Sequence, residues 1–154
     1  MDLFQKFYDR ALRFLSYRPR SEKEIADFLA KKKVTPVVVA KILKKLKEQN
    51  LVNDREFTKW WVEQRTKFRP RGLRVIKMEL KQKGIKPELI EKIISNDQFL
   101  ISNKEAVKKL IIKKITNYKG LPKRELYHKL SQFLLRRGFD WDTVKNAVDD
   151  SLGK

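Results

Sequence analysis

Few side chains in this 154-residue sequence could carry out catalysis. Cys is absent, which removes disulfides, thiolate metal sites and cysteine nucleophiles, and His128 is the only histidine. Glu125 precedes His128 by three residues on one helical face, but such a pair is more often a surface hydrogen bond than an acid–base couple. No glycine-rich phosphate loop occurs. We therefore expect no catalytic residue, no metal site and no cofactor, and we predict that the protein is not an enzyme.

Positive charge is the main chemical feature of the chain. Lys and Arg number 38 against 19 Asp and Glu, a formal net charge of +19. Such an excess favours a polyanionic partner, and phosphate contacts gain affinity from counterion release. We expect contacts to the phosphates of single- or double-stranded DNA. A lysine-rich surface that is merely solvated stays open as an alternative. No segment has the paired basic and aromatic faces of a helix lying on a membrane.

Two Arg-Pro-Arg loops are the first candidate contact sites, at Arg18-Pro19-Arg20 and Arg69-Pro70-Arg71. Proline stiffens each corner, and guanidinium groups bind phosphate or carboxylate in a bidentate manner. The alternative is that Arg18 and Arg69 pair with Asp or Glu and join neighbouring modules. Arg71 and Arg74 lie at a predicted helix start, where positive charge is unfavourable, so this alternative is weaker for them.

Lysine runs are the second kind of candidate. One follows the face opposite Ile42 and Leu46, and a similar run recurs after Val107. Each is either a solvated helix face or a surface that follows a phosphate backbone without reading bases. The full set of candidate contacts to nucleic acid or to a protein partner is Arg18, Arg20, Lys41, Lys44, Lys45, Arg69, Arg71, Arg74, Lys108, Lys109, Lys113, Arg136 and Arg137.

Aromatic residues accompany the basic loops. Tyr17, Phe68 and Tyr118 could stack on unpaired bases, but such residues more often pack under a turn, and we expect packing. Trp60 and Trp61 are adjacent and so point about 100° apart on a helix. We predict that one is buried in its module, while the other contacts a neighbouring module or a partner.

The elements that position these residues are helices. Apolar residues recur with helical periodicity, and no alternating strand pattern appears. Helix starts are predicted at the capping boxes Ser21/Glu24 and Ser102/Glu105 and at Thr35-Pro36, Asp54, Pro87, Pro122 and Asp140, and helix ends at Gly84 and Gly138. Nine helices result. No apolar run has the roughly 18–20 residues of a membrane span. We expect a soluble, cytoplasmic monomer.

A threefold repeat organises the helices. The segment from Leu29 to Pro36 aligns with the segment from Leu80 to Pro87, 51 residues later, and a third copy begins at Leu134. The same offset relates the two Arg-Pro-Arg loops. We predict an all-α protein of three tandem three-helix modules, at residues 1–53, 54–98 and 99–154, which form an elongated, curved array.

Several motifs resemble one family. They are Ala11-Leu12-x-x-Leu15 with Arg18, Ser21 and Glu24; Asp54, Phe57, Arg65, Gly72, Ile76, Glu79-Leu80 and Lys83-Gly84-Ile85; and Phe133-Leu134-x-x-Arg137-Gly138-Phe139. In their order and spacing the chain resembles the RecX family of regulators of the recombinase RecA. The resemblance implies a cytoplasmic protein of three three-helix modules that lies along the RecA–DNA filament and inhibits RecA. A rigid basic array on the filament could limit its extension or favour its disassembly.

Two other functions are compatible with the same residues. A basic helical surface could belong to a DNA- or RNA-binding regulator that acts alone, because three-helix modules and helix-turn-helix modules look alike in sequence. It could also belong to an adaptor for an acidic protein partner.

Overall fold

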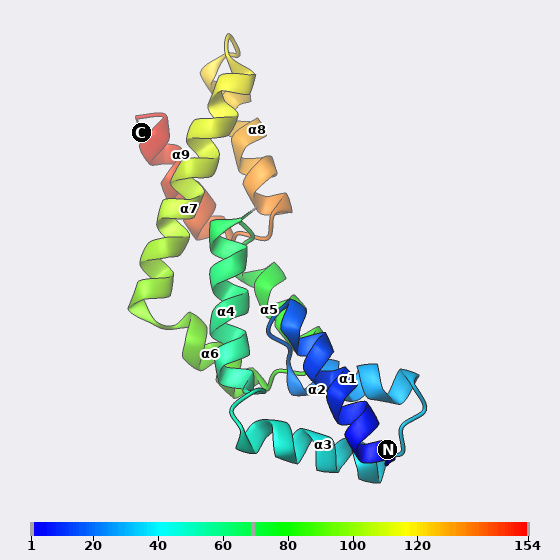
Figure 1. Cartoon of the computed structure of the whole chain (residues 1–154). Coiled ribbons are helices and arrows are strands. Elements are labelled where there is room, and N and C mark those ends of the chain that lie inside the picture. The colour runs from blue at the N-terminus through cyan, green and yellow to red at the C-terminus, as the bar shows by residue number, and fades with distance from the viewer. Residues whose placement is uncertain (1, 69, 154) are drawn as a thin grey trace. The chain divides into compact units, whose positions relative to one another are not determined.

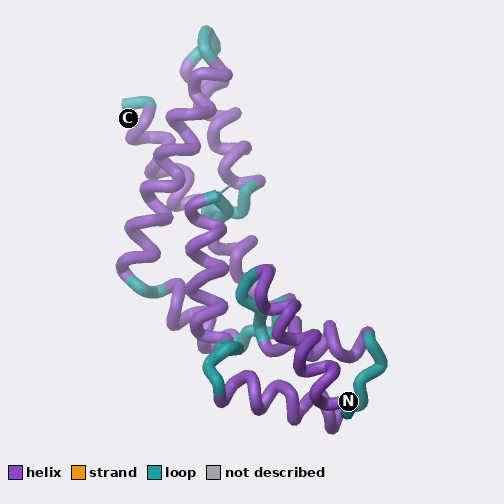
Figure 2. The backbone as a smooth tube through the Cα atoms, in the orientation of Figure 1, coloured by secondary structure: helices purple, strands orange, loops and turns teal. Residues whose placement is uncertain are grey.

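The computed structural model describes residues 2–68 and 70–153, without the side chains of residues 97, 98, 101 and 102. Within this part the chain is all α-helical, with nine α-helices, one 3-10 helix and no strand, as the fold prediction required (Figures 1 and 2). The helices are α1 Leu3–Tyr17, α2 Glu22–Lys31, α3 Pro36–Glu48, α4 Asp54–Lys67, α5 Leu73–Gln82, α6 Pro87–Ile94, α7 Asp97–Ile115, α8 Lys123–Arg136 and α9 Trp141–Ser151, with the 3-10 helix η1 at Thr116–Tyr118.

Three helix starts follow the capping signals of the sequence. At α2 the Ser21 hydroxyl accepts from the Glu24 N–H while the Glu24 carboxylate accepts from the Ser21 N–H, a complete capping box. Asp140 caps α9 by accepting from the Thr143 N–H. At α3 the helix begins at Pro36 as predicted, although the side chain of Thr35 makes no capping hydrogen bond.

The predicted cap of α4 is wrong by one residue. The Asn53 side-chain oxygen accepts from the backbone N–H groups of Arg55 at 2.9 Å and Glu56 at 3.2 Å, so Asn53 is the cap. Asp54 is the first helical residue. Its carboxylate is used elsewhere, since its Oδ1 accepts from the backbone N–H of Glu22 at 2.9 Å, at the start of α2.

The predicted start of the seventh helix at Ser102 is also wrong, because α7 already begins at Asp97. Phe99 is buried, and with Asn103, Ala106, Val107 and Leu110 it continues one buried face at helical spacing. Burying Phe99 therefore extends the helix by more than a turn beyond the local capping signal. The module boundary expected at residue 99 falls inside this helix.

The second helix of each module ends in the same way. After α2, α5 and α8 the chain takes a left-handed residue, at Lys33, Gly84 and Gly138. Gly84 N–H donates to the Lys81 carbonyl and Ile85 N–H to the Leu80 carbonyl, and the other two ends show the same pair of bonds. This is the Schellman pattern, in which a residue with positive φ closes the last turn.

The chain divides into two compact units. One contains the chain up to Trp61 together with Leu80–Leu89, and the other contains Val62–Glu79 and the chain from Ile90 onward. In the first, α1, α2 and α3 pack together around Tyr8, Ala11, Ile25, Leu29, Ile42, Leu46 and Val52 (Figure 1). In the second, α7, α8 and α9 enclose Val107, Leu110, Ile111, Leu130, Leu134, Phe139, Val144 and Val148 (Figure 1). Helices of the middle module contribute to both units.

Each unit has a hydrogen bond at equivalent positions of the repeat, donated by a side-chain hydroxyl in the first unit and by a backbone N–H in the second. In the first unit the Ser21 hydroxyl donates to the Lys83 carbonyl at 2.7 Å, and we call this contact of the start of α2 with the end of α5 the first joint. In the second unit Gly72 N–H donates to the Arg137 carbonyl, also at 2.7 Å, and this is the second joint. Gly72 lies 51 residues after Ser21. The duplication therefore preserved a contact as well as the helices.

The second joint requires glycine at position 72. A Cβ atom there would lie 2.0 Å from the carbonyl carbon of Gly138, which is backbone and has no room to move aside.

In the described part of the chain, no helix is both long and apolar enough to cross a membrane.

Candidate functional site

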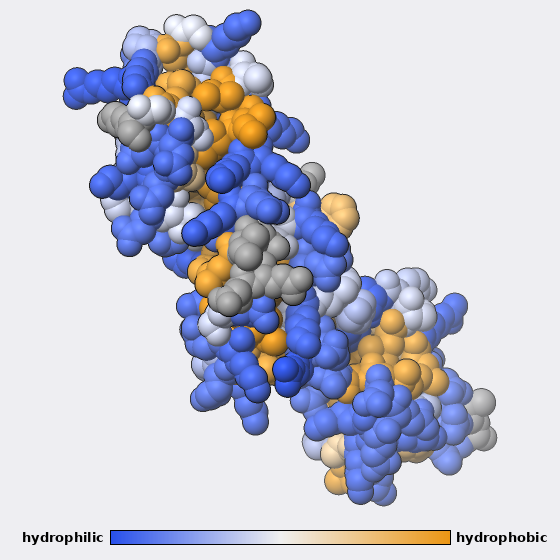
Figure 3. All heavy atoms as spheres, turned by 90° about the vertical axis from the view of Figure 1, so that its left-hand side faces the viewer, coloured by the Kyte–Doolittle hydropathy of each residue, from blue (hydrophilic) through white to orange (hydrophobic). Residues whose placement is uncertain are grey.

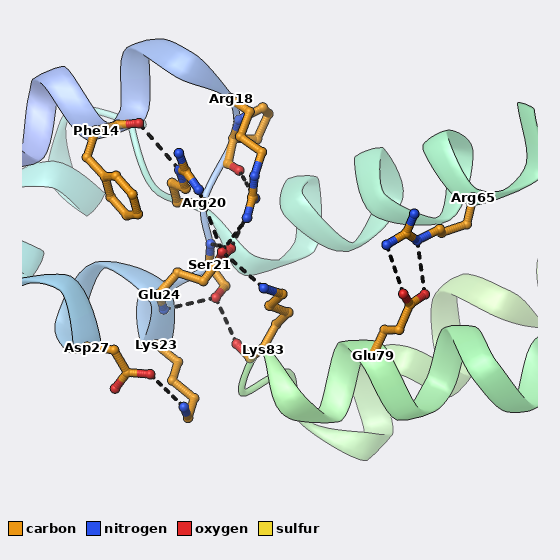
Figure 4. Close-up of polar contacts among 11 residues, drawn as sticks. Phe14, Arg18, Arg20, Ser21, Lys23, Glu24, Asp27, Arg65, Glu79 and Lys83 are labelled. Atoms are coloured by element: carbon orange, nitrogen blue, oxygen red, sulfur yellow. Dashed lines mark hydrogen bonds and ion pairs between the residues drawn. The ribbon is translucent and has the colours of Figure 1, made fainter. Parts of the chain in front are cut away.

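The first Arg-Pro-Arg loop is built around a carboxylate. The Arg18 guanidinium forms hydrogen bonds to both carboxylate oxygens of Glu24, and Lys83 approaches the same group at 3.4 Å (Figure 4). Burial works to raise the pKa of Glu24, but the hydrogen bonds from Arg18 and from the Ser21 N–H, with the charge of Lys83, outweigh it and keep this pKa below its usual value. Glu24 thus stays ionised at the first joint.

Arg18 also contacts both tryptophans of α4. Its guanidinium carbon lies 5.8 Å from the ring centre of Trp60 and 5.7 Å from that of Trp61, and Lys83 Nζ lies 5.4 Å from Trp61. These contacts fit the alternative in which Arg18 joins modules. The prediction that one tryptophan is buried is wrong, because both are half-buried beneath cations that remain partly solvated.

Arg20 is held against an aromatic pair. Its guanidinium lies 3.7 Å from the ring centre of Phe14, and its Nε donates to the Phe14 carbonyl at 3.3 Å (Figure 4). Phe14 in turn stacks on Phe28, with ring centres 4.2 Å apart. Burial and the neighbouring charge of Arg18 lower the pKa of Arg20. These contacts commit the side chain to the fold.

Arg137 occupies a comparable place at the second joint. Its guanidinium lies 5.0 Å from the ring centre of Phe133 and donates to the Pro70 carbonyl at 3.4 Å. Its own carbonyl accepts the bond from Gly72. Like Arg18 and Arg20, this candidate is engaged in packing.

The second loop differs from the first in its described arginine, Arg71, which forms no ion pair with a carboxylate of the described residues. The nearby carboxylate, Glu79, is bound by Arg65 at 2.8 Å (Figure 4). Arg74 is exposed and Arg71 half-buried, and neither forms an ion pair with any described residue. Arg69 lies outside the described residues. Arg71 and Arg74 therefore keep their charges available to an external anion.

The lysine runs are mostly exposed. Lys41 and Lys44 point to solvent on α3, whereas Lys45 lies 4.2 Å from the ring centre of Tyr8. Exposed cations with no ion pair among the described residues also occur on α7 and α8, at Lys108, Lys109, Lys113 and Arg136. Figure 3 shows hydrophilic side chains interleaved with smaller hydrophobic patches on one face. These cations suit phosphate contacts without base recognition.

The three aromatic residues next to basic loops differ in exposure, which the sequence did not predict. Tyr17 is 74% exposed and Phe68 is 65% exposed, so the expected packing of these two rings is wrong. Tyr118 is half-buried against the core of the second unit, with Lys114 and Lys129 near its ring, as expected. Repeat position was the signal that could have singled out the exposed pair, since Phe68 follows Tyr17 by 51 residues.

The fold and these basic loops define a class, that of tandem three-helix proteins with cationic surfaces. Family models of the first, second and third RecX three-helix domains match residues 8–46, 53–93 and 103–148. A crystal structure of RecX from Lactobacillus salivarius superposes with a TM-score of 0.82 at 27% identity, covering 97% of this chain and 96% of that one. A second crystal structure, of a regulatory protein RecX, gives a TM-score of 0.79 at 30% identity and covers 95% and 73% of the two chains.

Curated relatives agree with the structural matches. The chain is 36% identical over 148 residues to the regulatory protein RecX of Bacillus subtilis (strain 168), and 35% identical over 157 residues to that of Listeria monocytogenes. These alignments cover 96% and 99% of the chain but 56% of each relative, so the chain spans little more than half of their length. The chain belongs to the RecX family.

Proposed function

We propose that the protein binds the RecA–DNA filament and inhibits RecA without chemistry of its own, by limiting filament extension. The presence of all three RecX domains carries this proposal, because the curated relatives that share them are named regulatory proteins. A charge of +19 suits a filament whose DNA presents phosphate. The protein acts in this proposal as a cytoplasmic monomer, in the compartment of its partner.

The loop before α5 is the proposed point of contact. Arg71 and Arg74 carry charges that no carboxylate of the described residues neutralises, whereas Arg18, Arg20 and Arg137 are committed to packing. The exposed lysines of α3 and α7 then add phosphate contacts that carry no sequence information. Acidic groups of RecA and DNA phosphates are both anions that this loop could bind.

The test is RecA's DNA-dependent ATPase, titrated with the protein at low salt. Wild type should inhibit, and Arg71→Ala/Arg74→Ala should inhibit much less while its helical circular dichroism stays unchanged. Lys59→Ala/Lys67→Ala is a matched control, since it removes the same charge from α4 at lysines that pair with Glu56 and Glu63. An ATPase and a strand-exchange rate that saturating wild type leaves unchanged would contradict the proposal.

One alternative remains testable in the same preparation. A regulator that acts alone would bind bare DNA tightly and with sequence preference, without RecA. Electrophoretic mobility shifts on several DNA sequences distinguish the two, because a filament inhibitor that follows the phosphate backbone should bind them with similar affinity.

A further inference from the structure

Two aromatic rings at the same place in the repeat face solvent. Tyr17 is the last residue of α1, and Phe68 follows the last residue of α4, each directly before an Arg-Pro-Arg loop. They are the most exposed aromatic residues of the described chain, ahead of Trp141 at 51%. Single exposed apolar residues are ordinary on protein surfaces. Exposure of an aromatic ring at the same repeat position in two modules is less easily explained as the chance exposure of single apolar residues.

Neither ring takes part in the contacts that occupy the other aromatics. Phe14 stacks on Phe28, Trp60 and Trp61 lie beneath Arg18, and most of the remaining rings have a cation or a second ring within 6 Å or so. Tyr17 and Phe68 have no such neighbour and no side-chain hydrogen bond among the described residues. Most of the surface of each of these residues is therefore exposed, which leaves room for a flat partner.

Cations without carboxylates stand close to each ring along the chain. Arg13 precedes Tyr17 by four residues on α1, which places both on one helix face. Arg13 is exposed and pairs with no carboxylate of the described residues. Phe68 is followed by Arg71 and Arg74, which are likewise unpaired. Each unit thus offers an exposed ring and, within six residues of it along the chain, an arginine that pairs with no carboxylate of the described residues.

We propose that Tyr17 and Phe68 each stack on an unpaired base of single-stranded DNA, while the neighbouring arginine contacts a phosphate. A base is flat, and its strand is a polyanion, so one ligand satisfies both the ring and the cation. A protein partner would favour a cluster of apolar side chains, whereas each ring here is followed directly in the sequence by an Arg-Pro-Arg loop. The choice of DNA rests on the proposed function.

Stacking makes the contact selective for single strands. In a duplex the bases already stack on one another, so an exposed ring gains nothing from them without unstacking, whereas the phosphates remain accessible. The free lysines should therefore bind both forms, and the two rings should distinguish them. In the third module the ring of Tyr118 is covered by packing and by Lys114 and Lys129, so we assign it no such role.

The experiment measures binding of the full chain to an oligothymidylate strand and to a duplex of the same length by fluorescence anisotropy at fixed salt. Tyr17→Ala and Phe68→Ala should each weaken single-strand binding about five-fold or more, the cost of losing one stacked base. Duplex binding should change less than two-fold. Tyr17→Phe and Phe68→Tyr should restore single-strand affinity. Trp141→Ala is the matched control, because Trp141 is an exposed aromatic residue that does not adjoin an Arg-Pro-Arg loop in the sequence, and this variant should bind as wild type does.

Three results would overturn the inference. The first is that Tyr17→Ala/Phe68→Ala binds single-stranded DNA with an affinity within two-fold of wild type. The second is that the alanine variants lose as much affinity for duplex as for single-stranded DNA. The third is that they lose RecA inhibition but keep single-strand binding, which would indicate a contact with protein. Its failure is separable from that of the proposed function. If single-strand binding depends on the two rings but the wild-type protein leaves the RecA ATPase unchanged, only the proposed function is contradicted.

Discussion

Lys33 adopts a backbone conformation that the other two modules assign to glycine. Its φ is 63°, and the matching residues Gly84 and Gly138 have φ of 80° and 91°. Its N–H closes the end of α2 by donating to the Ala30 carbonyl at 2.9 Å, as the two glycines do at α5 and α8. A side chain in the left-handed region is strained by its Cβ, a strain that glycine avoids.

Lys33→Gly should therefore stabilise the protein. Relief of the left-handed strain exceeds the added entropy of the unfolded chain, and we expect a gain of about 0.5–1 kcal/mol in the free energy of unfolding. Urea unfolding followed by circular dichroism measures it. Lys41→Gly removes the same charge from an exposed site inside α3 and should cost about 1 kcal/mol, because glycine weakens helix interiors. Equal effects of the two substitutions would show that charge, not φ, is responsible.

At the scale of elements, one carboxylate ties the start of α4 to the start of α2. Asp54 accepts from the Glu22 N–H, and the Glu22 carboxylate pairs with Lys47 of α3 at 2.8 Å. Burial, together with the neighbouring negative charge of Glu22, raises the pKa of Asp54 to about 6. The hydrogen bond from Lys47 lowers the pKa of Glu22, although burial opposes it.

The raised pKa makes stability depend on pH in a definite direction. The folded state holds the Asp54 proton more tightly than the unfolded state, whose value is 3.8, so this group costs stability as pH rises from about 4 to about 6. Asp54→Asn keeps the oxygen that accepts from Glu22 and removes the charge. We therefore expect Asp54→Asn to have a higher free energy of unfolding than wild type at pH 7. Since Asp54 is only partly buried, solvent screening limits this increase to about 1 kcal/mol.

Urea unfolding of wild type and Asp54→Asn between pH 4 and pH 7 tests this dependence. The advantage of the variant should shrink as the pH falls toward 4, where wild-type Asp54 is also protonated. Asp150→Asn, at an exposed site of α9, changes the net charge equally and should follow the wild-type profile. A constant difference between Asp54→Asn and wild type across this range would contradict the assignment.

Local signals in the sequence predicted the elements well and their contacts poorly. Helix periodicity, the Ser21/Glu24 capping box and the two glycine ends act within a few residues, and the structure keeps them. The start of α7 escaped prediction because burial of Phe99, a tertiary effect, extended the helix past the local cap. Asp54 escaped for a similar reason, since its carboxylate serves a helix that begins 32 residues earlier.

The same limit applies to the candidate site across the whole molecule. A run of arginines in sequence does not reveal which of them meets a carboxylate. Glu24 of α2 binds Arg18 from the preceding loop and Lys83 from 59 residues away, whereas Arg71 and Arg74 pair with no carboxylate of the described residues. The exposure of Tyr17 and Phe68 was equally hidden, because burial depends on what the rest of the chain leaves uncovered.

Net charge and local site make different predictions for salt dependence. Binding to single-stranded DNA should weaken with salt by a slope of about 0.7 in log–log terms for each phosphate that a cation neutralises. If Arg71 and Arg74 both contact phosphate, Arg71→Ala/Arg74→Ala should reduce the magnitude of this slope by about 1.4. Anisotropy titrations over a range of NaCl concentrations measure the slope directly.

The paired lysines of α4 separate the two explanations. Lys59→Ala/Lys67→Ala lowers the net charge of +19 by the same amount, but it removes cations that already face Glu56 and Glu63. A slope close to wild type for this variant, beside a reduced slope for the arginine variant, would place phosphate at the loop before α5. If the slope falls equally in the two double variants, DNA binding depends on the overall charge alone. That result would contradict the assignment of the loop before α5 as the contact.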